Sequence, residues 1–162
     1  MTGISGGAGR RVVEPWVGVP LTKFVDEAGA RLTLLMTPAG QVMAQYGFTR
    51  AVDVMAAAAL GAAIVASTGE IARMLEEPRF NALNHQGMRH GVFVAAFDSP
   101  RGRLLALVVY GSNSSFGLVQ LFFEEFVREL VAACPVPETI RPVLAEDFER
   151  ELNQSLATLF KV

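Results

Sequence analysis

The stretch from Glu77 to Phe126 constrains the fold most, because its apolar pattern changes from strand-like to helical along the way. A short polar segment, Leu83 to Gln86, precedes two segments rich in valine, phenylalanine and leucine, at 91–97 and 103–110. The residues 98–102, Asp-Ser-Pro-Arg-Gly, are typical of a tight turn between strands. We therefore expect three strands here, the last two forming a hairpin, followed by a helix.

That helix begins after Ser114 or Ser115, either of which can cap it. Its apolar positions recur at helical spacing, and Cys134-Pro135 ends it. Earlier in the chain, Pro20 suits a first helical turn and Gly29 ends a short helix. Residues 31–36 and 41–46 then flank Thr37-Pro38-Ala39-Gly40, which predicts a further hairpin.

The longest predicted element is a helix capped by Thr49 and ended before Glu76-Glu77-Pro78. One side of it carries a mostly bulky stripe, which we expect to cover the sheet: Leu60, Ile64, Ser67, Ile71 and Leu75. The neighbouring faces carry Ala59, Ala62, Ala63 and Ala66, whose side chains allow another helix or backbone to come close. Tight packing within the domain and docking of a partner are both compatible with such a surface.

The predicted order is helix, two strands, helix, three strands, helix, with one more helix at the end of the chain. This order favours the α+β class, as a five-stranded antiparallel sheet with helices on both faces. We expect a flexible segment at 1–19, one domain at 20–134 and an amphipathic helix at 143–162. The last helix carries an apolar stripe that needs either a partner or its own domain to cover it: Phe148, Leu152, Leu156, Leu159 and Phe160.

Composition excludes several classes of function. The formal net charge is −2 without a basic stretch, which argues against nucleic-acid binding. The single cysteine and the absence of a signal-like apolar core at the start favour the cytoplasm. The longest apolar run, 54–66, is shorter than the roughly 20 residues that cross a bilayer, so we expect no membrane insertion.

No convincing catalytic or metal-binding set is present. His85 and His90 have no cysteine or carboxylate pair at metal-ligand spacing, so we expect neither a metal nor a cofactor. Ser114 and Ser115 lack the G-x-S-x-G context of a hydrolase, and capping explains them. We therefore expect a protein that acts on another protein and has no catalytic site of its own.

Two pieces of the chain, ARMLEEPRF followed by NHQG, and SSFGLVQLFFEE, together with the order of elements, resemble the roadblock (dynein light-chain type) family. The resemblance covers about residues 21–133 and implies a roadblock fold, related to profilin-like sheets. It is strongest to bacterial members that regulate a Ras-like GTPase in gliding motility and cell polarity.

The resemblance also implies a homodimer formed by pairing of the third strand, here Leu83, Asn84, His85 and Gln86. The GTPase would dock on the long helices at Ala59, Ala62, Ala63, Ala66 and Glu70, and the stripe from Phe148 to Phe160 would reach a remote surface of it. Two alternatives stay open: a scaffold that only dimerises and tethers, and a small-molecule sensor with the sheet as its pocket floor.

Overall fold

The computed structural model describes residues 10–12, 14–136 and 143–160 of the 162-residue chain. The elements in chain order are β1 (Arg10–Val12), the 3-10 helix η1 (Pro15–Val17), α1 (Gly18–Ala28), β2 (Ala30–Met36), β3 (Val42–Tyr46), α2 (Ala51–Met74), β4 (Ala82–Gln86), β5 (Gly91–Ser99), β6 (Gly102–Tyr110), α3 (Phe116–Ala133) and α4 (Val143–Leu159).

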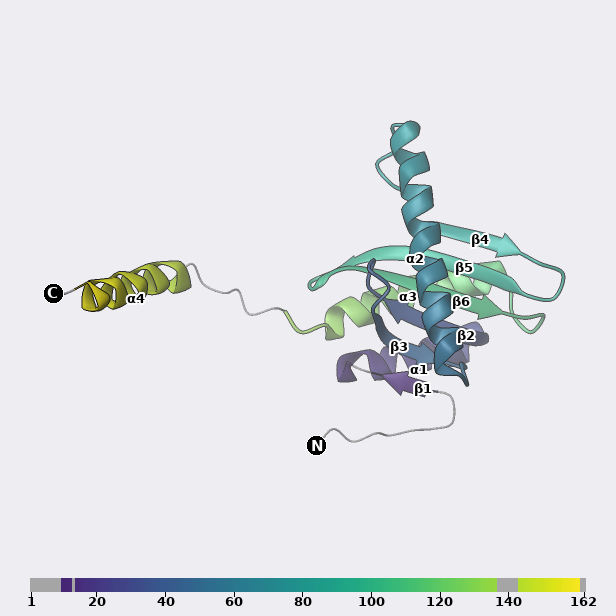
Figure 1. Ribbon diagram of the computed structural model, residues 1–162. Helices are drawn as coiled ribbons and strands as arrows, with labels where there is room; N and C mark the ends of the chain where they lie inside the picture. Colours follow the sequence, from purple (N-terminus) through teal and green to yellow (C-terminus); the bar gives the residue numbers. More distant parts are fainter. Residues whose placement is uncertain (1–9, 13, 137–142, 161–162) are drawn as a thin grey trace.

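All described strands form one antiparallel sheet, in the order β1-β3-β2-β6-β5-β4 (Figure 1). The five predicted strands are present in the expected sequence order, which confirms the fold class. A sixth strand, β1, extends the sheet beyond β3, with Arg10 opposite Tyr46 and Val12 opposite Ala44. Three residues give too short a pattern to be recognised as a strand from sequence.

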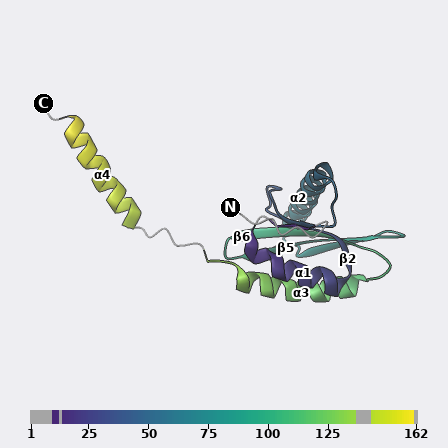
Figure 2. The ribbon, with the colours of Figure 1, turned by 90° about the horizontal axis from the view of Figure 1, so that it is seen from below.

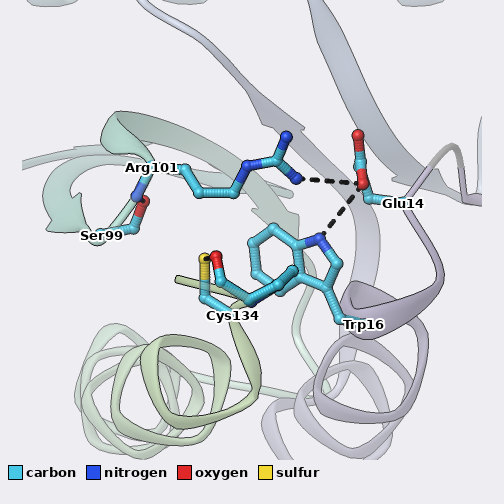
Figure 3. A network of polar contacts seen from close by, with 6 residues as sticks. Glu14, Trp16, Ser99, Arg101 and Cys134 are labelled. Atoms are coloured by element: carbon cyan, nitrogen blue, oxygen red, sulfur yellow. Dashed lines mark hydrogen bonds and ion pairs between the residues drawn. The ribbon is translucent and has the colours of Figure 1, made fainter. Parts of the chain in front are cut away.

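The prediction of a flexible segment at 1–19 is wrong for the part of it that the structure describes. Besides β1, residues 15–17 form η1, and Val17 is completely buried. Glu14 anchors this segment, because its carboxylate accepts a hydrogen bond from the Trp16 indole (3.2 Å) and pairs with Arg101 in the β5–β6 turn (3.3 Å; Figure 3). The domain therefore begins before Pro20.

Helices cover both faces of the sheet, with α1 and α3 on one face and α2 on the other (Figure 2). The α1/α3 side holds the larger core, in which the rings of Phe24, Phe93, Phe123 and Phe126 pack with centroids 5.1–6.0 Å apart. Such aromatic contacts add to the stabilisation from burial alone.

A half-buried ion cluster links the two helices on this side. The Lys23 ammonium on α1 pairs with Glu129 and, at 2.9 Å, with Glu125, both on α3. The hydrogen bonds to Glu129 and Glu125 raise the pKa of Lys23 above its ordinary value, so it stays charged throughout the physiological range.

The helix boundaries agree with most of the sequence signals. Gly29 ends α1 in the left-handed conformation (φ 64°), and Ser115 caps α3 by accepting a hydrogen bond from the Leu118 amide (3.3 Å). The expected Thr49 cap on α2 is wrong: Arg50 occupies that position and no side chain caps the helix. The preceding turn requires Gly47, because its φ is +85° and a Cβ there would lie 2.1 Å from the Arg31 carbonyl oxygen.

Candidate interaction surface

The sheet-facing side of α2 is built from small residues. Ala58 and Gly61 are buried, and a Cβ added to Gly61 would lie 2.9 Å from Cε of Met36 and 3.3 Å from Cδ1 of Leu107. Half-buried Val54, Ala57, Ala62, Ile64 and Val65 complete the contact. The helix therefore lies close to the strands, as small side chains allow.

The prediction that the bulky stripe of α2 covers the sheet is wrong for most of its members. Leu60 is 64% exposed, Ile71 49% and Leu75 67%, and only Ile64 packs against the core. The helix is rotated so that small side chains face the strands. This arrangement leaves large apolar side chains in solvent on the opposite side.

The outward side of α2 carries most of the residues expected to bind a partner. Ala59, Ala63, Ala66 and Glu70 are exposed, whereas Ala62 is half-buried against the sheet and is a correction to that set. Exposed Val52, Met55, Leu60, Ile71 and Met74 lie on or beside the same surface. We call these exposed residues the α2 outer face. A continuous apolar surface of this kind usually marks a contact site.

The sequence reasoning missed a charge on this face. Arg73 is well exposed, and its guanidinium donates through Nε (3.0 Å) and Nη2 (2.9 Å) to Oε2 of Glu70. The spacing of three residues on a helix could have revealed the pair. Glu70 and Arg73 therefore form a polar end to an otherwise apolar surface.

By length and composition α2 could also cross a membrane, and it is the one helix in the described parts of the chain that meets this test. One or two such helices are weak evidence, since core helices of soluble proteins pass as well. Here α2 packs along the sheet through Ala58 and Gly61. We therefore treat its outward side as a surface for contact with protein.

The open edge of the sheet lies next to this helix. β4 pairs with β5, and among the described strands its other edge has no partner. α2 crosses the strands, and its C-terminal end extends past β4 (Figure 1). An unpaired strand edge with an apolar helix projecting beside it favours a second chain at this place.

The side chains of β4 are arranged so that its two faces differ. Leu83 lies on the α2 side, opposite Val94, and is 40% exposed. Asn84 and Gln86 lie on the other side, where the Tyr110 hydroxyl is 2.8 Å from Oδ1 of Asn84 and 2.9 Å from Oε1 of Gln86. Tyr110 in turn packs against Gly91, where a Cβ would come within 2.1 Å of the ring. This cluster fixes the strand while leaving its backbone edge open.

A small hollow joins α2 to β4. It has a volume of about 180 Å³ and is lined mainly by apolar side chains, among them Ile64, Val65, Phe80, Leu83 and Val94. Thr68 also lines it, but its hydroxyl donates to carbonyls of its own helix. The hollow therefore adds apolar surface between the α2 outer face and the open edge.

The serines and His90, weighed above for catalysis or metal binding, and Asp98 of the β5–β6 hairpin have separate structural partners. Ser114 donates to the Ala28 carbonyl, Ser115 caps α3, and Asp98 pairs with Arg79 at 2.7 Å. The Arg31 guanidinium lies 3.0 Å from Nε2 of His90. In the described ranges no three His, Cys, Asp or Glu side chains are grouped to hold a metal.

The predicted C-terminal helix is present as α4, which lies apart from the sheet in both views (Figures 1 and 2). Four of the five residues of its expected stripe are exposed: Leu152, Leu156, Leu159 and Phe160. The side chain of Phe148 lies outside the described residues.

The chain forms an α+β domain with an exposed apolar helix face and an open strand edge among its described strands. Residues 20–109 match the Roadblock/LC7 domain, and the chain belongs to this family. A comparison with curated proteins gives no match.

Solved structures give the same fold. The domain is similar to Myxococcus xanthus MglB, with a TM-score of 0.65 and 24% identity over 73% of this chain and 94% of that one. It is similar to the gliding protein MglB of Thermus thermophilus, with a TM-score of 0.64 and 26% identity over 73% of this chain and 87% of that one. The domain is also similar to a third structure, an MglB with a tetrameric arrangement. The TM-score is 0.62, and the identity is 27% over 72% of this chain and 86% of that one.

The Tyr110 cluster can be tested by removing its hydroxyl with Tyr110→Phe. We expect the free energy of unfolding to fall by about 1 kcal/mol, because two side-chain amides on β4 lose their partner. Tyr46→Phe is the matched control, since no hydrogen bond of the Tyr46 hydroxyl is found among the described residues. Urea denaturation measures the difference, and equal effects of the two substitutions would contradict the assigned role.

Proposed function

We propose that this protein is a homodimeric regulator of a Ras-like small GTPase of the MglA type and has no catalytic site of its own. The observation that carries the proposal is the α2 outer face, a long apolar surface that continues to the open edge of β4. Similarity to MglB at 26–27% identity supports the choice of partner. The proposed setting is the cytoplasm, in gliding motility or cell polarity.

In the proposed dimer, the β4 strands of two copies pair and bring the α2 helices together on one face. Leu83, Asn84, His85 and Gln86 would form the seam, and the hollow beside Leu83 would be closed by the second copy. Pairing satisfies the backbone groups of both strands and covers apolar surface at the same time. The GTPase would then contact the part of the α2 outer face left exposed around Ala59, Ala63 and Ala66.

The proposed mechanism is positional. Nucleotide and Mg²⁺ belong to the GTPase, and the α2 helices hold its switch segments in the conformation that orients the attacking water. Such an effect requires the dimer to bind that conformation more tightly than the others. The stripe of Leu152, Leu156, Leu159 and Phe160 on α4 provides a second contact with the same partner.

Two alternatives follow from the same surfaces. A scaffold would bind its partner through the α2 outer face without changing the rate of hydrolysis. A small-molecule sensor would need a pocket. The hollow of about 180 Å³ beside β4 is smaller than the roughly 300–1,000 Å³ of ordinary ligand sites, whereas a groove of about 460 Å³ between α3 and β4 is within that range. Phosphate release from the GTPase, measured with and without this protein, separates the proposed function from both.

Dimerisation gives the first test. Light scattering at micromolar concentration should give twice the chain mass of 17.4 kDa. Leu83→Lys should shift the mass towards the monomer, because lysine on an edge strand opposes strand pairing. Leu121→Lys, at an exposed leucine on α3, should leave the dimer intact. A monomeric mass for the parent protein would remove the basis of the proposed docking platform.

Ala66→Arg tests the docking surface. Because Ala66 is exposed, the free protein can leave the new charge in water and should keep its melting temperature and its mass. A complex that covers this position must bury an unpaired charge, so the affinity for the GTPase should fall by roughly a hundredfold or more. Ala132→Arg, an exposed alanine on α3, is the matched control. Undiminished stimulation of hydrolysis by Ala66→Arg would exclude docking at this position.

Arg73→Ala tests whether the mechanism is positional. An arginine that reached the transferred phosphoryl group would account for roughly 10³–10⁵ in the rate of hydrolysis. If Arg73 only forms the exposed pair with Glu70, its removal should change the stimulated rate less than about tenfold, because such pairs contribute at most about 1 kcal/mol. Single-turnover phosphate release measures this rate. A loss of a thousandfold would replace the positional mechanism with a catalytic arginine.

A further inference from the structure

The face of the sheet opposite α2 is covered by α1 and α3 but leaves a groove between α3 and β4. The groove has a volume of about 460 Å³. Its floor is formed by Ala82, Phe93 and Ala95, and its wall by Phe123 and Val127 of α3. Because α3 and α2 cover opposite faces of the sheet (Figure 2), the groove lies on the other side of the sheet from the α2 outer face. Its wall on α3, formed by Phe123 and Val127, belongs neither to the proposed β4 seam nor to the α2 outer face.

The rim of the groove is polar. Gln120, Glu124 and Arg128 follow one another along α3 at helical spacing, and all three are exposed. Near the start of α3, Phe116 is 41% exposed, and its ring lies 6.2 Å from that of Phe93. An apolar floor between polar edges is the usual shape of a site for an amphipathic helix.

The chain itself contains a helix of this kind. On α4, Leu152, Leu156 and Leu159 are spaced by four and three residues and share one side, with Phe160 beside them, and all are exposed. Gln154 lies on the opposite side at helical periodicity. A short isolated helix is only marginally stable in water, so covering the apolar side of α4 would stabilise it.

Chain length allows α4 to reach the groove. α3 ends at Ala133 and α4 begins at Val143, so nine residues connect them. Nine residues can span up to about 30 Å. The groove lies beside the part of α3 from Arg128 back to Gln120, roughly 8–20 Å from its end at 1.5 Å per residue. A helix that returns along α3 therefore runs antiparallel to it.

In an antiparallel arrangement, α4 and α3 also match each other in length and in the charges that face each other. From Glu149 to Phe160, α4 is about 17 Å long, and from Arg128 to Phe116, α3 is about 18 Å long. This orientation places the carboxylate of Glu149 near the guanidinium of Arg128 and the ring of Phe160 near exposed Phe116. The apolar stripe of α4 then lies over the floor of the groove.

The structure has α4 undocked and apart from the sheet. We propose that α4 also takes a second position when no partner is bound, docked into the groove between α3 and β4 of its own chain. Docking buries the stripe of Leu152, Leu156 and Leu159 against Ala82 and Val127, over the already buried rings of Phe93 and Phe123. A partner that binds α4 must first displace it from this groove, so the contact restrains binding through α4. The inference concerns the free protein and does not depend on the proposed GTPase.

Hydrogen exchange of the full chain, read by mass spectrometry, tests the inference without any partner. An isolated helix of this length is only marginally stable, so undocked α4 should exchange within about tenfold of an unfolded peptide. Docking should slow exchange at 149–160 by roughly a hundredfold or more. Leu152→Asp combined with Leu156→Asp should abolish the protection, and Gln154→Asp should keep it.

The groove needs its own pair of variants. Val127→Asp should release α4, whereas Leu118→Asp, at an exposed leucine off the groove, should not. Continued protection of β5 and β6 shows that the Val127 variant is folded. As a milder change, Arg128→Glu should reduce the protection of α4 from exchange by a few fold, because it replaces an attraction to Glu149 with a repulsion. Adding Glu149→Arg should restore the protection.

Fast exchange of α4 in the parent protein would overturn the inference. Protection that survives Val127→Asp in a folded protein would also overturn it, because α4 would then be covered at another site, such as the α2 outer face or another copy of α4. Failure of GTPase stimulation with intact protection of α4 would contradict the proposed function and leave the groove assignment standing.

Discussion

Close contact between α2 and the sheet determines which surfaces of this protein remain exposed. Ala58 and Gly61 bring the helix near Met36 and Leu107, and a larger side chain at Gly61 would require the Met36 side chain to shift. Because α2 contacts the sheet mainly through small residues, this helix of 24 residues buries little of its own apolar area. Leucine, isoleucine and methionine side chains are therefore turned outward, and at about 25 cal/mol per Å² their burial would strongly favour association.

The two sides of the sheet end differently: β1 extends it beyond β3, whereas the outer edge of β4 is open among the described strands. β1 covers the edge of β3, and Glu14 holds the segment that follows through Trp16 and Arg101 (Figure 3). At the opposite edge, Tyr110 holds the side chains of β4 while its backbone stays open. An open edge normally carries a risk of uncontrolled pairing. The open edge of β4 lies beside the α2 outer face. A chain that pairs with β4 must therefore also fit against that face, which restricts the chains that can pair.

The sequence predicted the five long strands and the helices because turn residues and periodicity agreed at each boundary, as at Gly29 and Ser115. It predicted the wrong side of α2 to face the sheet, namely the stripe that includes Leu60, Ile71 and Leu75. Alanine suits a tight interior and an exposed contact equally well, so composition cannot orient a helix whose inner side is small. β1 was missed because its pairing depends on β3, which is distant in sequence, and the Glu14–Arg101 contact is equally non-local.

The two unpartnered helical surfaces differ in shape, and this difference affects how they act together. The α2 outer face is broad and belongs to a helix that packs on the sheet, whereas the stripe of α4 is narrow and belongs to a helix apart from the sheet. A partner that contacts both gains from their covalent connection, since the second contact is effectively intramolecular. If α4 is free for only a fraction of the time, the apparent affinity through it falls by that fraction. Binding at α2 would therefore depend on the partner alone, while the contribution of α4 would be set by how tightly this chain holds its own helix.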